Sequence, residues 1–488
     1  MCGRDGASAV CAPSRASPTA PSRQPRARGR NRATRSAANP PMTSSPVAPE
    51  GEAAWRGRIW RLAWPVILSS MSISALGAVD TAVMGRLPDP AFVGGVAVGA
   101  TSINFLLWTL MFLRMGTTGL TAQAFGAGDM SEAQAALRRA LMVSTALGLV
   151  LIPAAPLLFG LAFVQLGASE TVTAHAVTYT DIRVWGLPAS LGNTVILGWL
   201  FGLQRTRLAL LIQVAFNLLN VVLAVLFVIA FRWDVPGVAA ATLIAEWVGL
   251  ALGLGAIAHV TGRMGGRASL AAVLNRARLF AVARINANVF ARSVVLTTAQ
   301  VHFALQGAQF GDVALAANAI LIAIHSVLGM GLDGFAVAAE TLVGSAVGRK
   351  DRRAFDRAVR TAFLWAGLVG IAFSFAYVAL GWLAISLMTS LPEVRTAALE
   401  FLPWSAAVPI VLVWGYMLDG VFSGATRTAD MRNAMILSVA VYAAAYALLV
   451  PLWGNHGLWA AFLALQSARA VTLGALYPRA ARMAGPRT

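Results

Sequence analysis

The stretch IWRLAWPVILSSMSISALGAVDTAVMGRL, residues 59–87, decides how this chain must fold. Between Ile59 and Asp80 its only charged residue is Arg61, and it is long enough to cross a hydrocarbon core of about 30 Å as a helix. Comparable apolar segments recur along the chain, and they begin near residues 59, 92, 133, 172, 206, 236, 278, 312, 355, 394, 430 and 456. The sequence therefore predicts an all-α polytopic membrane protein with about twelve transmembrane helices.

The composition excludes most soluble classes of protein. Of the 488 residues, 58% are hydrophobic and 12% are charged, whereas soluble domains carry about 25% charged residues. The formal net charge is +18, but the arginines after residue 54 lie mostly in short connections, so we expect a lipid bilayer and no nucleic acid as partner. Cys2 and Cys11 both precede the apolar segments, which argues against a disulfide, a thiolate metal site or a cofactor in the body of the chain.

The first 54 residues form an extension of a different kind. They are rich in Arg, Ser, Pro and Ala and contain no apolar region typical of a secretory signal, so we expect disorder. Two further interpretations stay open at this point. One is an organelle transit peptide, and the other is a start assigned too early, with Met42 as the true first residue.

The connections between the apolar segments alternate in charge. One set carries the arginines, and the other set is poor in them. The arginine-bearing set comprises Arg138 and Arg139, Arg205 and Arg207, the stretches 263–284 and 348–360, Arg427 and Arg432, and the tail from Arg479. By the positive-inside rule this set is cytoplasmic, so we expect a multi-pass protein of the inner (plasma) membrane with both termini in the cytoplasm.

The chain also repeats itself at an offset of 222 residues (348 − 126). The stretch AQAFGAGD at 122–129 matches GSAVGRKD at 344–351, each followed by a basic helix start. Six crossings separate the two copies, so both halves enter the membrane from the same side as parallel repeats. We therefore expect two six-helix lobes, residues 55–265 and 266–488, with a cleft between them suited to alternating access.

Six strings in order along the spans resemble one known family. They are LAWPVILSSMSISALGAVDTAVMGRL (62–87), FLRMGTTGLTAQAFGAGD (112–129), GVAAATLIAE (237–246), LDGFAVAAETLVGSAVG (332–348), VWGYMLDGVFSGATRTADMRN (413–433) and GNHGLWAAFL (454–463). The chain resembles the multidrug and toxic compound extrusion (MATE) family, and within it the DinF-like branch, over about residues 59–480. The resemblance implies two lobes in a V, and export of amphipathic, often cationic compounds against an inward flow of protons or sodium. We expect a monomer with a small-molecule substrate.

Asp80 is the first candidate for ion coupling. An ionisable residue inside the membrane is costly, and a low-dielectric cleft favours the neutral form of a carboxyl group, so such a group can exchange a proton or hold a cation. Without the resemblance, an interface acid at the end of the span is a reasonable alternative. The resemblance implies that Asp80 is the coupling carboxylate, with Asn220 and Thr242 completing its cavity.

The sequence departs from the family at one position of that cavity. The acid that the family carries four residues after Asn220 is Ala224 here. A hard cation such as sodium prefers several charged or carbonyl oxygens, so the departure favours proton coupling through Asp80 over sodium. Asn217, one helical turn before Asn220, is either a further donor or packing glue between helices.

Other polar residues in the spans are candidates for a second coupling or substrate site. Glu246, one turn after Thr242, either titrates or pairs with an arginine, and Arg114 is expected to pair with an acid such as Asp80 or Glu246. Pairing with Asp80 would hold that carboxylate charged and weaken proton coupling. His302 is the repeat partner of Asp80, and as a lone histidine in a span it is either a titrating group or a structural one.

The second half carries acids of its own. Asp333, Glu340 and Asp419 lie in its spans, with Arg292 and His325 on neighbouring spans. We expect a buried paired network there in preference to direct binding of a cationic substrate. Substrate contact is expected to be diffuse and made by Met and aromatic side chains, with these candidates: Met71, Phe105, Trp108, Met111, Phe335, Trp414 and Tyr416.

Three competing functions fit the sequence less well. An enzyme is not expected, because the sequence contains no H-E-x-x-H, G-x-S-x-G or Walker-type phosphate motif. A flippase of lipid-linked sugars or polysaccharides would line its cleft with more arginine. A membrane sensor or scaffold would not need a buried carboxylate.

Overall fold

The computed structural model describes residues 52–85, 90–166 and 169–486. Within these ranges the chain is helical and contains no β-strand. Residues 52–54, which the sequence places in the extension, already belong to the first helix. The expectations of disorder and of a start at Met42 otherwise concern residues outside the described ranges.

The first half of the chain supplies eight α-helices among the described residues. They are α1 (Glu52–Met84), α2 (Pro90–Thr109), α3 (Phe112–Gly126), α4 (Met130–Leu166), α5 (Glu170–Arg183), α6 (Leu187–Gly202), α7 (Thr206–Val225) and α8 (Asp234–Met264). A 3-10 turn over Val184–Gly186 joins α5 to α6, and a π turn over Leu226–Ala230 extends α7. Ser169 caps α5 by accepting a hydrogen bond from the Val172 backbone N–H.

The second half begins with one short helix and continues with six long ones within the described residues. They are α9 (Leu270–Val273), α10 (Arg276–Ala308), α11 (Asp312–Arg349), α12 (Arg352–Met388), α13 (Pro392–Gly424), α14 (Thr428–Trp453) and α15 (Asn455–Arg482). Asn275 and Asp351 cap α10 and α12 in the same way, through side-chain oxygens that accept from the backbone N–H three residues on.

The predicted membrane spans are confirmed. Eleven helical segments of the described residues are long and apolar enough to cross a membrane, with α2 and α3 counted as one segment and α5 and α6 as another. With 33 residues, α1 is within the 25–38 residues of these segments and holds the apolar run from Ile59, so we count it as a twelfth. From the second segment on, each segment begins within three residues of its predicted start, whereas the separate helices α3, α6 and α9 were not predicted.

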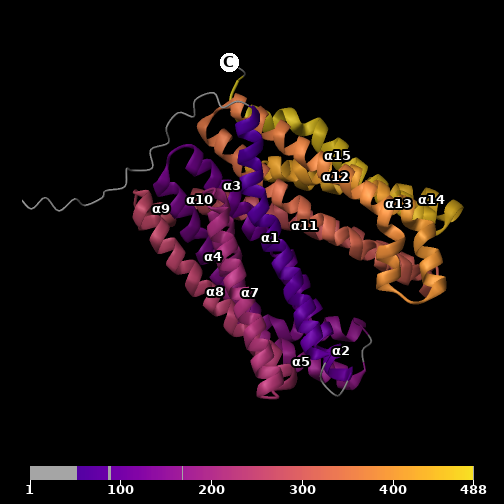
Figure 1. Ribbon diagram of the computed structural model, residues 1–488. Coiled ribbons are helices and arrows are strands. Elements are labelled where there is room, and N and C mark those ends of the chain that lie inside the picture. Colours follow the sequence, from indigo (N-terminus) through magenta and orange to yellow (C-terminus); the bar gives the residue numbers. More distant parts are fainter. Residues whose placement is uncertain (1–51, 86–89, 167–168, 487–488) are drawn as a thin grey trace, which may run out of the picture. The chain divides into compact units, whose positions relative to one another are not determined.

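Each half has an apolar core of its own. The core of the first half gathers around Trp199 and Leu200, and the larger core of the second half around Phe335, Phe355 and Trp459. The first turns of α1 belong to the second-half core. The helix α1 packs against α11 of the second half and also against α7 of the first half. Figure 1 shows α11 to α15 running beside one another, and α4, α7 and α8 grouped apart from them.

The contact between the halves follows the predicted repeat. On α3, a Cβ added at Gly126 would lie 2.1 Å from the Ser345 carbonyl oxygen of α11. On α11, a Cβ added at Gly348 would lie 2.0 Å from the Gln123 carbonyl oxygen of α3. The 222-residue offset turns the first contact into the second, because Gly126 corresponds to Gly348 and Ser345 to Gln123. Each helix therefore contributes a glycine to the crossing, at a point where no side chain fits.

The same offset relates the packing inside each half. A Cβ at Gly202 of α6 would lie 2.8 Å from the Thr118 carbonyl oxygen of α3. In the second half, a Cβ at Gly424 of α13 would lie 2.3 Å from the Glu340 carbonyl oxygen of α11. The repeat is therefore visible in backbone contacts as well as in sequence.

Candidate functional site

A cavity of about 400 Å³ lies among the helices of the first half. Asp80 of α1, Asn220 of α7 and Thr242 of α8 all line it, so the structure brings together the three residues expected to couple ions. Asn217, Glu246, Arg114 and Asp333 line the same cavity, and Asp333 reaches it from α11 of the second half.

Asp80 contributes an oxygen without a partner. Its side chain is half-buried, and its Oδ1 atom is buried and accepts no hydrogen bond from any described residue. A carboxylate can only accept hydrogen bonds, so this oxygen is available to a proton or a cation.

The amide of Asn220 is fixed on one side only. Its Nδ2 donates to the Thr242 hydroxyl at 3.1 Å, and that hydroxyl donates to the Val238 carbonyl oxygen at 3.1 Å. The Asn220 Oδ1 atom is buried, with no hydrogen-bond partner among the described residues. The cavity therefore contains two acceptor oxygens, of Asp80 and Asn220, that lack a donor within the described chain.

Asn217 has a structural role in this geometry. Its Nδ2 donates to the Ser72 hydroxyl at 2.8 Å, which ties α7 to α1. Its Oδ1 accepts from Gln213 at 3.2 Å. Both the nitrogen and the oxygen of the amide form hydrogen bonds, as expected if Asn217 holds two helices together.

Glu246 pairs with an arginine, which decides between its two predicted roles. Arg183 of α5 donates to both carboxylate oxygens of Glu246, at 2.6 Å and 2.9 Å. Both side chains are buried, and a bidentate pair of this kind is among the strongest polar contacts in proteins. Arg183 also acts electrostatically on Asp80, and it lines the same cavity.

Arg183 was not among the site residues predicted from the sequence. Two signals in the sequence point to it, because an arginine inside a span is as costly as an acid, and a buried Glu246 needs a cation to balance it. The arginine lies in the polar stretch TYTDIRVWG, residues 178–186, in the fourth predicted span.

The prediction that Arg114 pairs with Asp80 or Glu246 is wrong. Its Nη2 pairs with Asp333 of α11 at 3.2 Å, and not with Asp80 or Glu246. The reason is the close crossing of α3 and α11, which directs the Arg114 side chain toward the second half. The ion pair lies at the edge of the cavity and leaves Asp80 without an arginine bound to it among the described residues.

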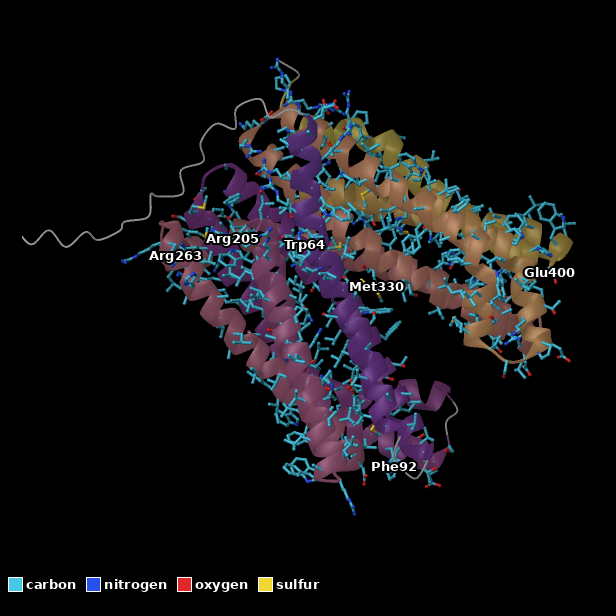
Figure 2. All side chains as sticks on the ribbon, in the orientation of Figure 1. Trp64, Phe92, Arg205, Arg263, Met330 and Glu400 are labelled. Carbon is cyan, nitrogen blue, oxygen red and sulfur yellow. The ribbon has the colours of Figure 1, made fainter. Side chains whose placement is uncertain are left out.

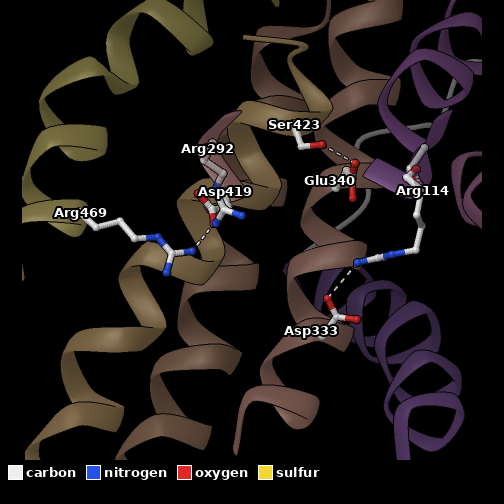
Figure 3. Close-up of polar contacts among 8 residues, drawn as sticks. Arg114, Arg292, Asp333, Glu340, Asp419, Ser423 and Arg469 are labelled. Carbon is white, nitrogen blue, oxygen red and sulfur yellow. Dashed lines mark hydrogen bonds and ion pairs between the residues drawn. The ribbon is translucent and has the colours of Figure 1, made fainter. Parts of the chain in front are cut away.

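Two of the three acids of the second half are paired with arginines, Asp333 with Arg114 and Asp419 with two others, whereas Glu340 forms no ion pair with a described residue (Figure 3). Asp419 of α13 accepts from Arg292 of α10 and from Arg469 of α15. Glu340 accepts a hydrogen bond from the Ser423 hydroxyl at 2.5 Å. Arg469 was not among the predicted partners. Asp419 and Glu340 are both buried, and neither lines the cavity around Asp80.

The two histidines of the second half have structural contacts. His302 Nδ1 lies 2.9 Å from the Tyr442 hydroxyl, and the rings of Tyr442 and Tyr446 meet it edge-on. His325 Nε2 lies 2.9 Å from the Ser405 carbonyl oxygen. These contacts are what the structural alternative for a lone histidine predicts.

Two of the seven predicted substrate contacts line the cavity around Asp80, and Met71, Phe105, Phe335, Trp414 and Tyr416 do not. Trp108 and Met111 line the cavity with Asp80 and are exposed, as a binding surface requires. Phe335 is only 1% exposed and belongs to the second-half core, so it packs and does not bind. The described residues contain no group of three or more His, Cys, Asp or Glu side chains arranged to hold a metal ion.

The chain matches a known family model and known proteins. A family model described as MatE matches residues 65–226 and 291–449, one stretch in each half. The chain is 37% identical to DNA damage-inducible protein F of Escherichia coli over 421 residues, which cover 86% of this chain and 92% of that protein. A "Probable multidrug resistance protein NorM" of a Synechococcus species is 33% identical over 33% of this chain and 34% of its own length.

Solved structures share the fold. The structure of an outward-facing multidrug resistance MATE family transporter of the MOP superfamily matches with a TM-score of 0.80. The match covers 90% of this chain and 99% of that one at 18% sequence identity, so it concerns the fold alone.

Proposed function

The chain belongs to the MATE family, in its DinF-like branch, and we propose that it exports amphipathic cations in exchange for protons that bind at Asp80. Membership makes it a polytopic efflux transporter and not an enzyme. The proton, the cationic substrate and the role of Asp80 are the parts of this statement that we propose.

The observation that carries the proposal is the charge balance of the cavity. Its described lining includes three carboxylates, Asp80, Glu246 and Asp333, and two guanidinium groups, Arg183 and Arg114. Each arginine binds one of the other two carboxylates, and Asp80 forms no ion pair with a described residue. The cavity therefore carries one uncompensated negative charge when Asp80 is ionised and none when it is protonated.

This balance makes a proton and an organic cation compete. Both are stabilised by the charge of Asp80, so binding of one weakens binding of the other. Such mutual exclusion is what an exchange of protons for cations needs, provided that the cavity opens to each side in turn. The exposed Trp108 and the neighbouring Met111 offer an apolar and polarisable wall to the rest of an amphipathic molecule.

Sodium fits this cavity less well. A hard cation seeks several oxygen ligands, whereas Ala224, at the position of the family's second acid, is fully buried and offers no side-chain oxygen. This feature favours a proton, which needs one oxygen only.

Transport of anionic lipid-linked sugars is the weaker alternative. A phosphate-bearing substrate would need arginines that can turn toward it. Arg183 and Arg114 are instead held by Glu246 and Asp333. The negative balance of the cavity would repel such a substrate.

We also propose a monomer in the inner membrane with both termini in the cytoplasm. The arginine-rich connections support this orientation, and both halves of the cleft belong to one chain. A reporter enzyme that is active only outside the cytoplasm, fused after residue 488, should stay inactive. Activity of that fusion would reverse the orientation.

The proposal can be tested in liposomes that contain the purified full chain and a fluorescent cationic dye. An imposed pH gradient should drive dye export, and an imposed sodium gradient should not. Asp80→Asn should reduce proton-driven export at least about tenfold, because an amide cannot exchange a proton at neutral pH. The matched control is Asp312→Asn, at an exposed acid at the start of α11. Unchanged export by Asp80→Asn, or export driven by sodium alone, would overturn the proposal.

A further inference from the structure

A second cavity, of about 630 Å³, lies apart from Asp80, at the other end of α1. It is bounded by the start of α1, the turn between α6 and α7, the first turns of α7 and the end of α8. Five arginines and one histidine line it: Arg58, Arg61, Arg205, Arg207, Arg263 and His259. Among its described lining residues there is no Asp or Glu, so its electrostatic potential is strongly positive.

The cavity is built by the fold. Gln204 has a positive φ of 61° in the tight turn between α6 and α7, and its Oε1 accepts from Arg58 of α1 at 3.1 Å. The guanidinium of Arg207 lies 5.9 Å from the ring centroid of Trp64 on α1. These contacts hold the arginines of α1 and α7 toward each other, although their like charges repel.

Several of these arginines have no acid to neutralise them. Arg61, Arg207 and Arg263 form no ion pair with a described residue. Figure 2 shows Arg205 and Arg263 near the same level as Trp64 on α1. A cluster of this kind is costly unless an anion binds to it, and arginine forms paired hydrogen bonds with phosphate oxygens.

The remaining lining is apolar. Leu62, Leu208, Leu211 and Val260 complete the cavity, and Leu211 is 66% exposed on α7, a helix apolar enough to span the membrane. Trp64 next to them is the residue type that favours the boundary between lipid chains and water. The cavity thus joins a positive region to an apolar, lipid-facing one.

We infer that this cavity binds the headgroup of an anionic phospholipid, with the phosphate on the arginines and the acyl chains along Leu208 and Leu211. Free phosphate carries the same negative charge as the lipid headgroup, but it has no apolar part that could contact the leucines. The bound lipid connects α1, which carries Asp80, to α7 and α8, which carry Asn220 and Thr242. The ligand is therefore a structural lipid and not the exported compound.

Native mass spectrometry of the purified full chain tests this inference with phosphatidylglycerol and phosphatidylcholine as probes. The wild type should bind phosphatidylglycerol at least about tenfold more tightly, since each arginine near a membrane surface adds attraction to an anionic lipid. Phosphatidylglycerol, and not phosphatidylcholine, should also raise the melting temperature. Equal binding of the two lipids by the wild type would overturn the inference, and this comparison needs no variant.

The variant Arg61→Gln/Arg207→Gln/Arg263→Gln should lose this preference. The matched control is Arg276→Gln/Arg278→Gln/Arg284→Gln, at three exposed arginines of α10 that do not line the cavity, and it should keep the preference. Equal phosphatidylglycerol binding by the two triple variants would overturn the assignment. Displacement of phosphatidylglycerol from the wild type by millimolar inorganic phosphate would also overturn it, in favour of a site for free phosphate.

Discussion

At the offset of 222 residues, Asp80 and Asn220 of the first half correspond to His302 and Tyr442 of the second. Asp80 and Asn220 line a cavity and each present an oxygen without a donor. His302 and Tyr442 instead contact each other at 2.9 Å, and Tyr446, the counterpart of Ala224, packs edge-on against the histidine. The same backbone positions are open and polar in one half and filled by rings in the other.

The difference shows which features of the repeat are constrained by packing and which can differ between the two halves. The glycine contacts of α3 with α6 and α11 with α13 recur in both halves, because helix backbones can approach that closely only where a Cβ is missing. Side chains that face the centre of each bundle do not take part in these contacts. They can therefore diverge without disturbing the packing, and under our proposal only the first half retains a coupling site.

The buried charges differ between the halves in the same way. In the first half, the ion pair of Arg183 with Glu246 lies in the same cavity as Asp80, which forms no ion pair with a described residue. In the second half, Asp419 is shared by Arg292 and Arg469, and Glu340 is bound by Ser423. A carboxylate held by two guanidinium groups, as Asp419 is, fixes helix geometry, whereas Asp80, which forms no ion pair with a described residue, is available for exchange.

The sharpest test of the comparison sets Asp80→Asn against His302→Gln. In the liposome assay, the first should lose at least about tenfold of the proton-driven export, and the second should stay within about twofold of the wild type. The physical reason is that Asp80 is the uncompensated charge of its cavity, whereas the His302 ring is packed between tyrosines. A loss by His302→Gln as large as that by Asp80→Asn would show that both halves couple ions.

The next largest effect is expected for Arg183→Gln. Removing this guanidinium leaves Glu246 buried without its partner, which costs about 3–5 kcal/mol of unfolding free energy. Chemical denaturation of the purified protein measures this loss. The double variant Arg183→Met/Glu246→Met, which removes both charges, should recover most of it. A double variant no more stable than the single one would mean that the pair acts through other contacts.

The scaffold glycines should give smaller and equal effects in the two halves. Gly126→Ala and Gly348→Ala each force a Cβ against a carbonyl oxygen, and should each cost about 1–3 kcal/mol. The control is Gly255→Ala on α8, where an added Cβ meets no atom within 4 Å. Thermal unfolding compares the three variants. A large loss from only one of the first two would contradict the reciprocal crossing of α3 and α11.

The smallest effect is expected for Tyr442→Phe. It removes the hydroxyl that contacts His302 and keeps the ring, so it should cost about 0.5–1.5 kcal/mol and leave export within about twofold of the wild type. The matched first-half variant, Asn220→Leu, should reduce export more strongly, because it removes an acceptor oxygen from the cavity. Equal transport defects in these two variants would argue against a coupling site limited to the first half.

Much of the fold could be predicted from the sequence. The length and recurrence of the apolar segments predict the helices, because a chain in lipid must satisfy its backbone hydrogen bonds within each segment. The repeated glycines predict the relation between the halves. Asp80, Asn220 and Thr242 could be placed in one cavity only through the family resemblance, since they lie on three helices and no local pattern joins them.

By itself, then, the sequence determined the helical segments, the 222-residue repeat and the presence of an acid in the first span. Only the tertiary structure decided how the charges pair. Arg114 binds Asp333, Arg183 binds Glu246 and Arg469 joins Asp419, each across a large gap in sequence. An ion pair depends on atoms a few ångströms apart, and those distances are set by helix crossings that the order of residues along one helix does not reveal.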